Sequence, residues 1–398
     1  MSIKLNNYFH NLVISLLFIF FSCDISESQY IATNIPKVDT ICIHINSAIK
    51  QNFSDIFRNI DYILTPYDSI FCIGKFDKML ITDSLIFIMD RRISRGIYTL
   101  SHEGIPISAI HKTGAAPGEY VAMRDISYDR GNNSIKCLEI ARRKYIEYTL
   151  QGDYIKETDI PCSTSRMEEI GNNYIMYTDY ARNEELKWKG KYPNLILYNH
   201  NNKVIFAENF FQAPAAKATL ITSEPQFSKI NDTLYSLKPD HCNTIYHITS
   251  QQIYPAYILD FGPYNLNDEF WELASKKGTK YEQVNDFSNM KKFCETFRFL
   301  EGNDFFYLLC RQQKTLTHIF YSKKTKKIKL ISELNNDMDY ISLFRPIAIH
   351  GNKLYCLLDS ETVYNMKNEL KGILPDNILN NVEEFGNPII TIFTLKSF

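Results

Sequence analysis

Few side chains in this sequence have the spacing that catalysis or metal binding requires. The densest group of possible metal ligands is Asp240, His241 and Cys242, followed by His247. The repeat described below puts the first three in a turn and His247 on a strand, so we interpret them as a solvated turn and a strand histidine. HExxH, GxSxG and GxxxxGK[ST] motifs are absent. We therefore predict no catalytic residue, no metal and no cofactor.

The cysteines also lack a metal-binding pattern. The chain has nine of them and contains no CxxC pair. Cys137, Cys310 and Cys356 lie inside apolar, strand-like runs, where cysteine behaves as a small hydrophobic residue. We expect most of the cysteines to be free thiols.

Four side chains are candidates for binding a ligand: Glu119, Tyr120, Trp271 and His350. Glu119 and Tyr120 end the segment GAAPGEY (114–120), whose Pro-Gly pair fits the centre of a type II turn. We favour a structural role, in which both residues anchor a crossing by hydrogen bonds. The alternative is a ligand-facing Glu119 carboxylate at a channel mouth.

The roles of the other two candidates depend on where their segments lie in the fold. Trp271 falls in an insertion, where an indole suits recognition, although it also suits the buried face of a short docking helix. His350 ends a predicted innermost strand and would face a channel.

Charge and composition narrow the function classes. The chain has 44 basic and 45 acidic residues, a formal net charge of −1. Such a balance provides no general field for nucleic acid, so we exclude a nucleic-acid partner. Aromatic residues make up 14% of the chain, including 26 Tyr and 26 Phe, a composition that favours strands.

A repeat organises the chain into six units of about four strands each. Each unit has a polar turn that opens its second strand, and Asn, Asp and Gly suit tight turns. These turns are at 83–84, 132–133, 172–173, 231–232, 303–304 and 351–352. Such units predict an all-β, six-bladed β-propeller of four-stranded antiparallel blades.

The ring must be closed, and long connections must leave it. The last unit lacks an outer strand, and we expect an N-terminal strand at 59–65 to supply it. The spacing between turns predicts a helical and loop-like insertion at 262–296 and a second one at 364–387. Insertions in repeats often gather on the binding face.

The N-terminus predicts export. Leu12–Phe21 is a ten-residue apolar run, too short to span a bilayer and suited to a signal peptide. Ser22-Cys23 follows at once and resembles a bacterial lipobox. We predict a lipoprotein signal peptide at 1–22, a lipidated tether at 23–36 anchored through Cys23, and the propeller at 37–398. The predicted location is the outer membrane, periplasmic or surface-exposed.

The chain resembles the six-bladed β-propeller lipoproteins of Bacteroides-type gut bacteria, a largely uncharacterised family. GAAPGEY resembles the family's G-x-G-P-G-E-Y, with Ala116 in place of the usual Gly; 54–68 and YILDFG (257–262) also match. The resemblance covers nearly the whole predicted mature chain and implies its fold and its cell-envelope address. It also suggests O-glycosylation at four Asp-Ser/Thr sites: Thr40, Ser69, Ser84 and Thr233.

These observations favour a non-catalytic role. We expect a monomeric, membrane-anchored module that binds or scaffolds a glycan, a peptide or an envelope protein. A lyase or glycoside hydrolase with its site at the channel mouth is the alternative, and a sensor-like ligand module lies between the two. An enzyme would bring several ionisable groups with shifted pKa values together at one mouth.

Overall fold

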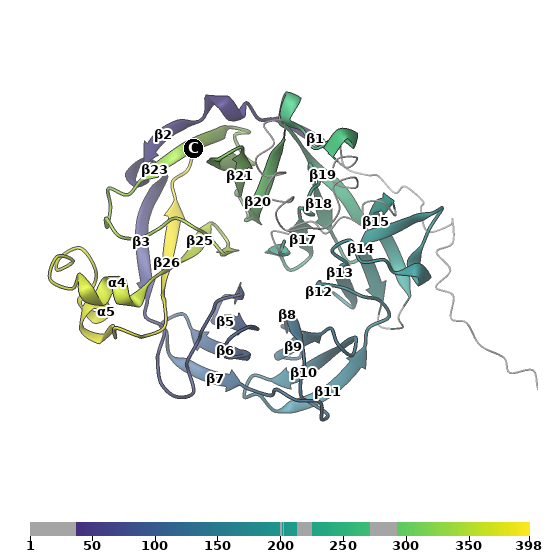
Figure 1. The fold of residues 1–398 in the computed structure, drawn as a ribbon, viewed down its shortest axis with the longest axis horizontal. Coiled ribbons are helices and arrows are strands. Elements are labelled where there is room, and N and C mark those ends of the chain that lie inside the picture. The colour runs from purple at the N-terminus through teal and green to yellow at the C-terminus, as the bar shows by residue number, and fades with distance from the viewer. Residues whose placement is uncertain (1–36, 200, 202, 213–224, 271–292) are drawn as a thin grey trace, which may run out of the picture.

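The computed structural model describes residues 37–199, 201, 203–212, 225–270 and 293–398. Six sheets stand around a central axis (Figure 1), which confirms the predicted six-bladed β-propeller. Cys23 and Trp271 lie outside the described residues, as do the signal peptide and tether predicted at 1–36. None of the described helices is long and apolar enough to cross a membrane.

Each blade begins at the axis and adds strands outward. Blade 1 consists of β4 (Lys78–Ile81), β5 (Leu85–Asp90), β6 (Gly96–Ser101) and β7 (Pro106–Ile110). Blade 2 consists of β8 (Met123–Asp129), β9 (Ser134–Glu139), β10 (Lys144–Thr149) and β11 (Tyr154–Asp159). Blade 3 consists of β12 (Arg166–Ile170), β13 (Asn173–Tyr177), β14 (Lys191–Asn199) and β15 (Val204–Gln212). Blade 4 consists of β16 (Ser228–Asn231), β17 (Leu234–Leu237), β18 (Thr244–Ile248) and β19 (Ile253–Asp260). Blade 5 consists of β20 (Cys294–Glu301), β21 (Phe305–Gln312), β22 (Thr315–Ser322) and β23 (Ile328–Asn335). Blade 6 begins with β24 (Ala348–His350), β25 (Lys353–Leu358) and β26 (Ile389–Leu395).

The N-terminal segment closes the ring. After the single-turn helix α1 (Phe53–Ile56), β3 (Phe57–Ile63) pairs with β26 as the outermost strand of blade 6. This confirms the predicted closing strand, shifted two residues toward the N-terminus. Two strands were not predicted: β1 (Asp39–Cys42) and β2 (Ile49–Asn52) add in parallel to the outer edges of blades 4 and 5. Their sequences are too short and polar to show strand alternation.

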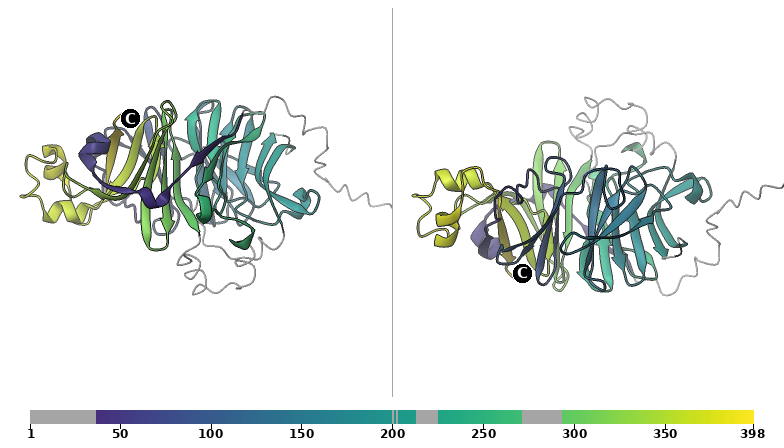
Figure 2. Two further views of the ribbon diagram at one scale, coloured as in Figure 1. Left: turned by 90° about the horizontal axis from the view of Figure 1, so that it is seen from above. Right: turned by 90° about the horizontal axis from the view of Figure 1, so that it is seen from below.

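The two ends of the ring differ. Tight turns join the first to the second strand in every blade and the third to the fourth in blades 1 to 5, and we call this end the turn face. The opposite end, the loop face, carries the blade-to-blade crossings and the connections between second and third strands. Both predicted insertions leave from the loop face, which faces the viewer in Figure 1 and lies opposite the C-terminus in Figure 2.

The insertions differ in detail from the prediction. The one at 262–296 ends too late, because Cys294 already begins β20. The one at 364–387 forms α4 (Ser360–Asn365) and α5 (Asp376–Asn381), which bury an aliphatic cluster beside blade 6 (Figure 1). Apolar side chains fill the spaces between neighbouring blades, as in the aromatic cluster of Phe57, Phe344 and Phe393.

Candidate functional site

The crossing at 114–120 contains the predicted type II turn. The Glu119 N–H donates to the Ala116 carbonyl at 2.9 Å, and Gly118 has φ of +78°, as the third position of this turn requires. The Glu119 carboxylate accepts a hydrogen bond from the Ala116 N–H at 3.0 Å. Glu119 therefore stabilises its own turn, as the structural interpretation predicted.

Tyr120 also has a structural role, because its hydroxyl is hydrogen-bonded to the backbone. It is fully buried, and its hydroxyl lies 2.7 Å from the Arg95 carbonyl and 3.0 Å from that of Ile110. The adjacent Gly118 packs against Tyr154 of β11, the outermost strand of blade 2. The crossing thus lies at the outer edge of the ring. The structure thus places Glu119 away from the channel mouth, where the alternative interpretation puts its carboxylate, and ligand binding by Glu119 or Tyr120 stays a prediction.

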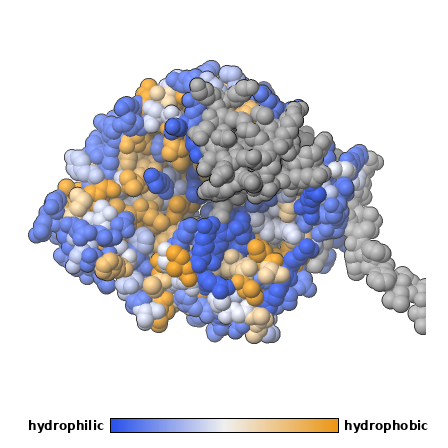
Figure 3. Space-filling view, in the orientation of Figure 1, coloured by the Kyte–Doolittle hydropathy of each residue, from blue (hydrophilic) through white to orange (hydrophobic). Residues whose placement is uncertain are grey.

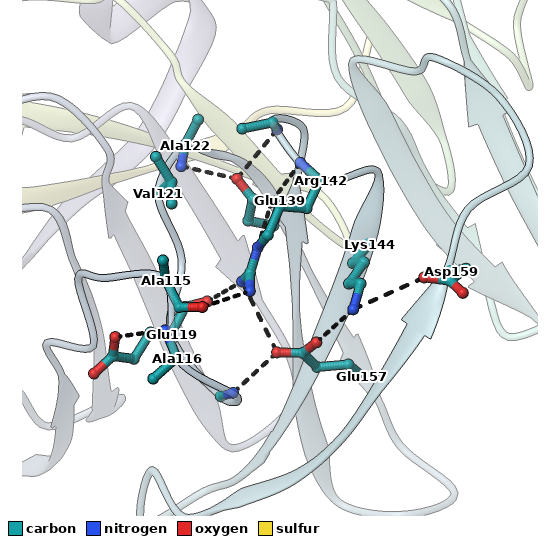
Figure 4. A network of polar contacts seen from close by, with 12 residues as sticks. Ala115, Ala116, Glu119, Val121, Ala122, Glu139, Arg142, Lys144, Glu157 and Asp159 are labelled. Carbon is teal, nitrogen blue, oxygen red and sulfur yellow. Dashed lines mark hydrogen bonds and ion pairs between the residues drawn. The ribbon is translucent and has the colours of Figure 1, made fainter.

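An arginine ties this crossing to blade 2 (Figure 4). The Arg142 guanidinium donates to the carbonyls of Ala115 and Glu119, and its Nε lies 3.3 Å from Glu139. Glu157 of β11 accepts from Gly118 N and from Lys144 Nζ, each at 2.9 Å. The hydrogen bond from Lys144 holds the pKa of Glu157 below its usual range. The network is structural, because its polar groups bond to one another.

We expect Gly118→Ala to destabilise the protein measurably. The left-handed φ alone should cost about 1–2 kcal/mol, and an added Cβ would lie 2.8 Å from the Tyr154 ring. Gly190→Ala is a matched control, because Gly190 has the same φ of +78° with nothing within 4 Å. Urea midpoints should show a loss at Gly118 that exceeds the loss at Gly190 by about 1 kcal/mol or more. Equal losses would mean that Tyr154 does not restrict the turn.

His350 lies at the turn-face mouth of the channel, as predicted from its strand position. Its Nε2 is 3.3 Å from Asp83 of blade 1, and burial lowers the pKa of His350. Arg130 of blade 2 bridges Asp83 at 2.8 Å and Asp232 of blade 4 at 3.2 Å. Ionisable side chains from four blades therefore meet at this mouth, and the bridge from blade 2 to blade 4 spans it.

Buried charges fill the channel itself. Lys78 Nζ of blade 1 lies 2.8 Å from Asp125 of blade 2 and 3.0 Å from Glu168 of blade 3. It also donates to the Ile126 carbonyl at 2.7 Å, and the Lys78 side chain is 2% exposed. A contact from blade 1 to blade 3 must pass in front of the inner strand of blade 2. This cluster therefore lies in the channel.

The burial of this cluster changes its proton affinities. Burial, only partly offset by Lys78, raises the pKa of Glu168 to about 7. Burial would also lower the pKa of Lys78, but Asp125 and Glu168 outweigh it and hold that pKa above its ordinary value. The cluster therefore consists of the Lys78–Asp125 ion pair and of Glu168, a second carboxyl whose pKa lies near neutrality.

Asp240, His241 and Cys242 with His247 are the residues interpreted above as a turn and a strand histidine. Among the described residues, no group of three or more His, Cys, Asp and Glu side chains is arranged to hold a metal ion. His247 instead lies 3.1 Å from Glu301 of blade 5, which also binds Lys323 at 2.9 Å. It joins blades 4 and 5, in keeping with its interpretation as a strand histidine.

A strained turn marks the loop-face mouth. Asp179 and Tyr180 follow β13 with φ of 54° and 59°, and two left-handed residues other than glycine cost about 1–2 kcal/mol each. Asn194 holds the turn by accepting from Tyr180 N at 3.0 Å and from the Thr178 hydroxyl at 2.9 Å. Such strain gathers at functional sites, so we take this turn as the centre of the candidate site.

Charged groups from three blades converge on Asp179. Its carboxylate lies 3.7 Å from Arg124 of blade 2. Burial, reinforced by Asp240 of blade 4 and opposed by Arg124 and Arg166, raises the pKa of Asp179 to about 6. Tyr180 donates its hydroxyl to the Asp240 carbonyl at 2.6 Å.

A groove of about 320 Å³ opens beside this turn, between blades 2 and 3. Its walls combine Leu138, Ile140 and Ile160 with the hydroxyl-bearing run 163–165 and with Arg124, Arg143 and Asp179. Glu139 also lines the groove, but its carboxylate already accepts three backbone N–H groups, those of residues 122, 141 and 142. The groove has the size and mixed lining of a small-ligand site.

Sequence reasoning missed this site. It singled out Glu119, Tyr120 and His350, which the structure places at an outer crossing and at the opposite mouth. The signal that could have found Asp179 is the long connection 178–190 inside a blade, since connections of this kind carry function.

Comparison with known proteins agrees with the fold. The model of a family described as "Domain of unknown function (DUF4934)" matches residues 40–394. No curated protein matches the sequence. A crystal structure of a candidate exported protein of Bacteroides fragilis NCTC 9343 is 15% identical with a TM-score of 0.72; the match covers 91% of this chain and 100% of that one. A member of the duf4221 family from Bacteroides vulgatus ATCC 8482 is 9% identical with a TM-score of 0.50, covering 85% and 99%. At these identities, the two structures share the fold alone with this chain.

Proposed function

This chain belongs to the family described as DUF4934, and on that premise we propose that it is a non-catalytic binding or scaffolding module of the cell envelope. The ligand, a glycan, a peptide or a protein segment, would enter the groove beside Asp179. One observation carries this proposal: the groove of about 320 Å³ adjoins a strained turn on the face from which the long connections leave.

The cellular location of the protein is part of the same proposal. Export, lipidation at Cys23 and attachment to the outer membrane are inferred from the N-terminal sequence. The Bacteroides fragilis neighbour is described as a candidate exported protein, which supports export. All four proposed glycosylation residues that the resemblance suggested, Thr40, Ser69, Ser84 and Thr233, are exposed, as acceptors need to be.

A hydrolase or lyase at the same mouth is the second candidate, and the raised pKa of Asp179 favours it. A glycosidase of the usual kind needs two carboxyl groups on either side of the substrate. In the described part of the groove, the second carboxyl is Glu139, which is committed to backbone N–H groups. This arrangement favours binding over hydrolysis.

The binding proposal is tested by a thermal-shift screen of residues 24–398 against envelope and dietary glycans and peptides. A ligand that binds only the folded state raises the melting temperature with concentration. Arg143→Gln in the groove should reduce that shift, whereas Lys353→Gln, an exposed cation on the turn face, should not. Turnover of the same ligand would move the assignment to an enzyme. A shift unaffected by Arg143→Gln would place the site elsewhere.

Asp179 should also give the stability of the protein a pH dependence. Its folded pKa of about 6 lies above the ordinary value of 3.8. Its contribution is therefore fully present below pH 4 and is lost as the pH rises through about 6. Asp179→Asn cannot ionise, so we expect it to gain on the order of 1–3 kcal/mol relative to the wild type between pH 4 and pH 8.

This expectation is checked by urea unfolding of both proteins across the pH range. Taking the difference between variant and wild type removes the contribution of Glu168, which titrates in the same direction. Asp159→Asn is the control, because the Asp159 side chain is 84% exposed. A difference between Asp179→Asn and wild type that stays constant with pH would contradict the burial of Asp179.

A further inference from the structure

Four exposed aliphatic side chains lie on the loop face of blades 1 and 2. Ile70 is 60% exposed, Ile93 65%, Val121 44% and Ile140 42%. Each belongs to a different connection: 64–77, 91–95, 111–122 or 140–143. Exposed aliphatic residues are ordinary when scattered singly, so their meaning depends on whether these four adjoin.

Contacts between the connections join the four into one strip. The Ile93 side chain packs over Gly74, where an added Cβ would lie 2.3 Å away. His111 Nε2 lies 3.3 Å from the Ile70 carbonyl. The Arg95 guanidinium donates to the Val121 carbonyl at 2.5 Å, and Ile140 N donates to the Ala122 carbonyl at 3.1 Å. We call these four connections the blade 1–2 strip.

The strip is also strongly basic. Its four connections carry seven Lys and Arg residues against three Asp and Glu residues, a net of +4, whereas the whole chain has −1. Some of this charge is paired with carboxylates outside the strip, as in Arg142 with Glu139 of β9. Lys75 and Arg92 lie 3.8 Å and 3.3 Å from Asp77, and like Arg143 they remain exposed. Figure 3 shows hydrophobic and hydrophilic residues interleaved on this part of the face.

We infer that the blade 1–2 strip contacts an anionic lipid surface. Aliphatic side chains at separate loop tips can enter the headgroup region, and the cations between them attract anionic headgroups. A peptide partner would instead need a continuous groove or a free strand edge along the strip. The strip lies in the lower part of the ring in Figure 1, and it adjoins the groove beside Asp179, because Ile140 and Arg143 belong to both.

The proposed anchor is compatible with this contact, and this one step rests on the proposed function. β1 runs parallel to β19 and Asp39 pairs with Tyr257, so Asp39 lies about midway along the outer edge of blade 4. The 14 residues from Cys23 to Pro36 reach about 45 Å when extended. The eight-residue strand β19 spans only about 26 Å. An anchor at Cys23 can therefore lie in the plane of the loop face.

The test uses residues 37–398, which hold all six blades and the closing strand but lack the anchor. Co-sedimentation with phosphatidylglycerol vesicles and with phosphatidylcholine vesicles measures the partition coefficient at 0.1 M salt. We expect binding to the anionic vesicles only, weakening as salt is added. Ile93→Ser with Ile140→Ser should lower the partition coefficient about tenfold. The matched control is Ile105→Ser with Ile155→Ser, which exchanges exposed isoleucines of the same two blades near the turn face.

The outcomes separate the possibilities. Absence of binding to anionic vesicles would overturn the inference, and so would equal losses in the two double variants. If the strip crosslinks to one envelope protein and the protein does not bind vesicles, the partner of the strip is a protein and the inference of a lipid surface is wrong. Equal urea midpoints for the two double variants verify that both remain folded. Because the anchor is absent from this test, its result does not depend on whether Cys23 is lipidated. Ile140 also lines the groove, so Ile93→Ser alone, outside the groove, keeps the result independent of whether the groove binds a ligand.

Discussion

Lys78→Met should lower the free energy of unfolding by about 3–5 kcal/mol. The substitution leaves Asp125 and Glu168 buried in the channel without their cation, and an uncompensated buried charge costs this much. Lys78 is 2% exposed, Asp125 1% and Glu168 7%, so water cannot replace the lost partner. Chemical denaturation at pH 8 measures the loss.

Two further variants make this expectation specific. Lys50→Met removes the cation of the exposed Lys50–Glu333 pair, whose side chains are 70% and 51% exposed, and should cost at most about 1 kcal/mol. Lys78→Met combined with Glu168→Met should recover part of the loss, because one buried carboxylate is then gone. A loss below 1 kcal/mol for Lys78→Met alone would mean that water reaches the cluster.

The same loss should depend on pH. The folded pKa of Glu168 is about 7, raised by burial from 4.5. Its neutral form is therefore favoured in the folded state, and the stability from this group is lost as the pH rises through about 7. Without Lys78 the carboxyl can take up a proton at low pH. The Lys78→Met loss should accordingly be smaller at pH 5 than at pH 8.

Phe57→Ala should open the closure of the ring. Phe57 is 1% exposed and begins β3, where its ring lies 4.8 Å from that of Phe344 and 4.9 Å from that of Phe393. Removing a buried phenyl group from a packed cluster costs about 3–5 kcal/mol. Because β3 pairs with β26, the cavity would lie where the two ends of the chain meet.

Urea unfolding and limited proteolysis would check this expectation. The proteolysis should show earlier cleavage near β3 and β26 than in the wild type. Phe385→Ala is the matched control, because Phe385 is 73% exposed and a surface substitution of this kind stays within about 0.5 kcal/mol. Similar midpoints for the two variants would show that the aromatic cluster does not hold the closure.

Much of the fold could be predicted because its signals are local. The polar turns at 83–84, 231–232 and 351–352 each open a second strand, as expected, since turn chemistry depends on two to four neighbouring residues. The Pro117–Gly118 turn followed from the same kind of signal. The closing strand could be predicted because the last repeat unit lacks its outer strand. The short strands β1 and β2 lack alternation, and only pairing with blades 4 and 5 makes them strands.

The sequence by itself thus determined the number of blades and the closing strand, and it is the basis of the cellular location proposed for the chain. Only the tertiary structure decided which side chains share the channel and the loop-face mouth. Lys78 lies 47 residues from Asp125 and 90 residues from Glu168, and Arg130 lies 102 residues from Asp232. Strand alternation and turn chemistry act over a few residues, whereas these contacts depend on how six sheets close around one axis. Charged residues that look like separate surface positions in the sequence therefore become, in the ring, one buried cluster and two groups at the mouths of the channel.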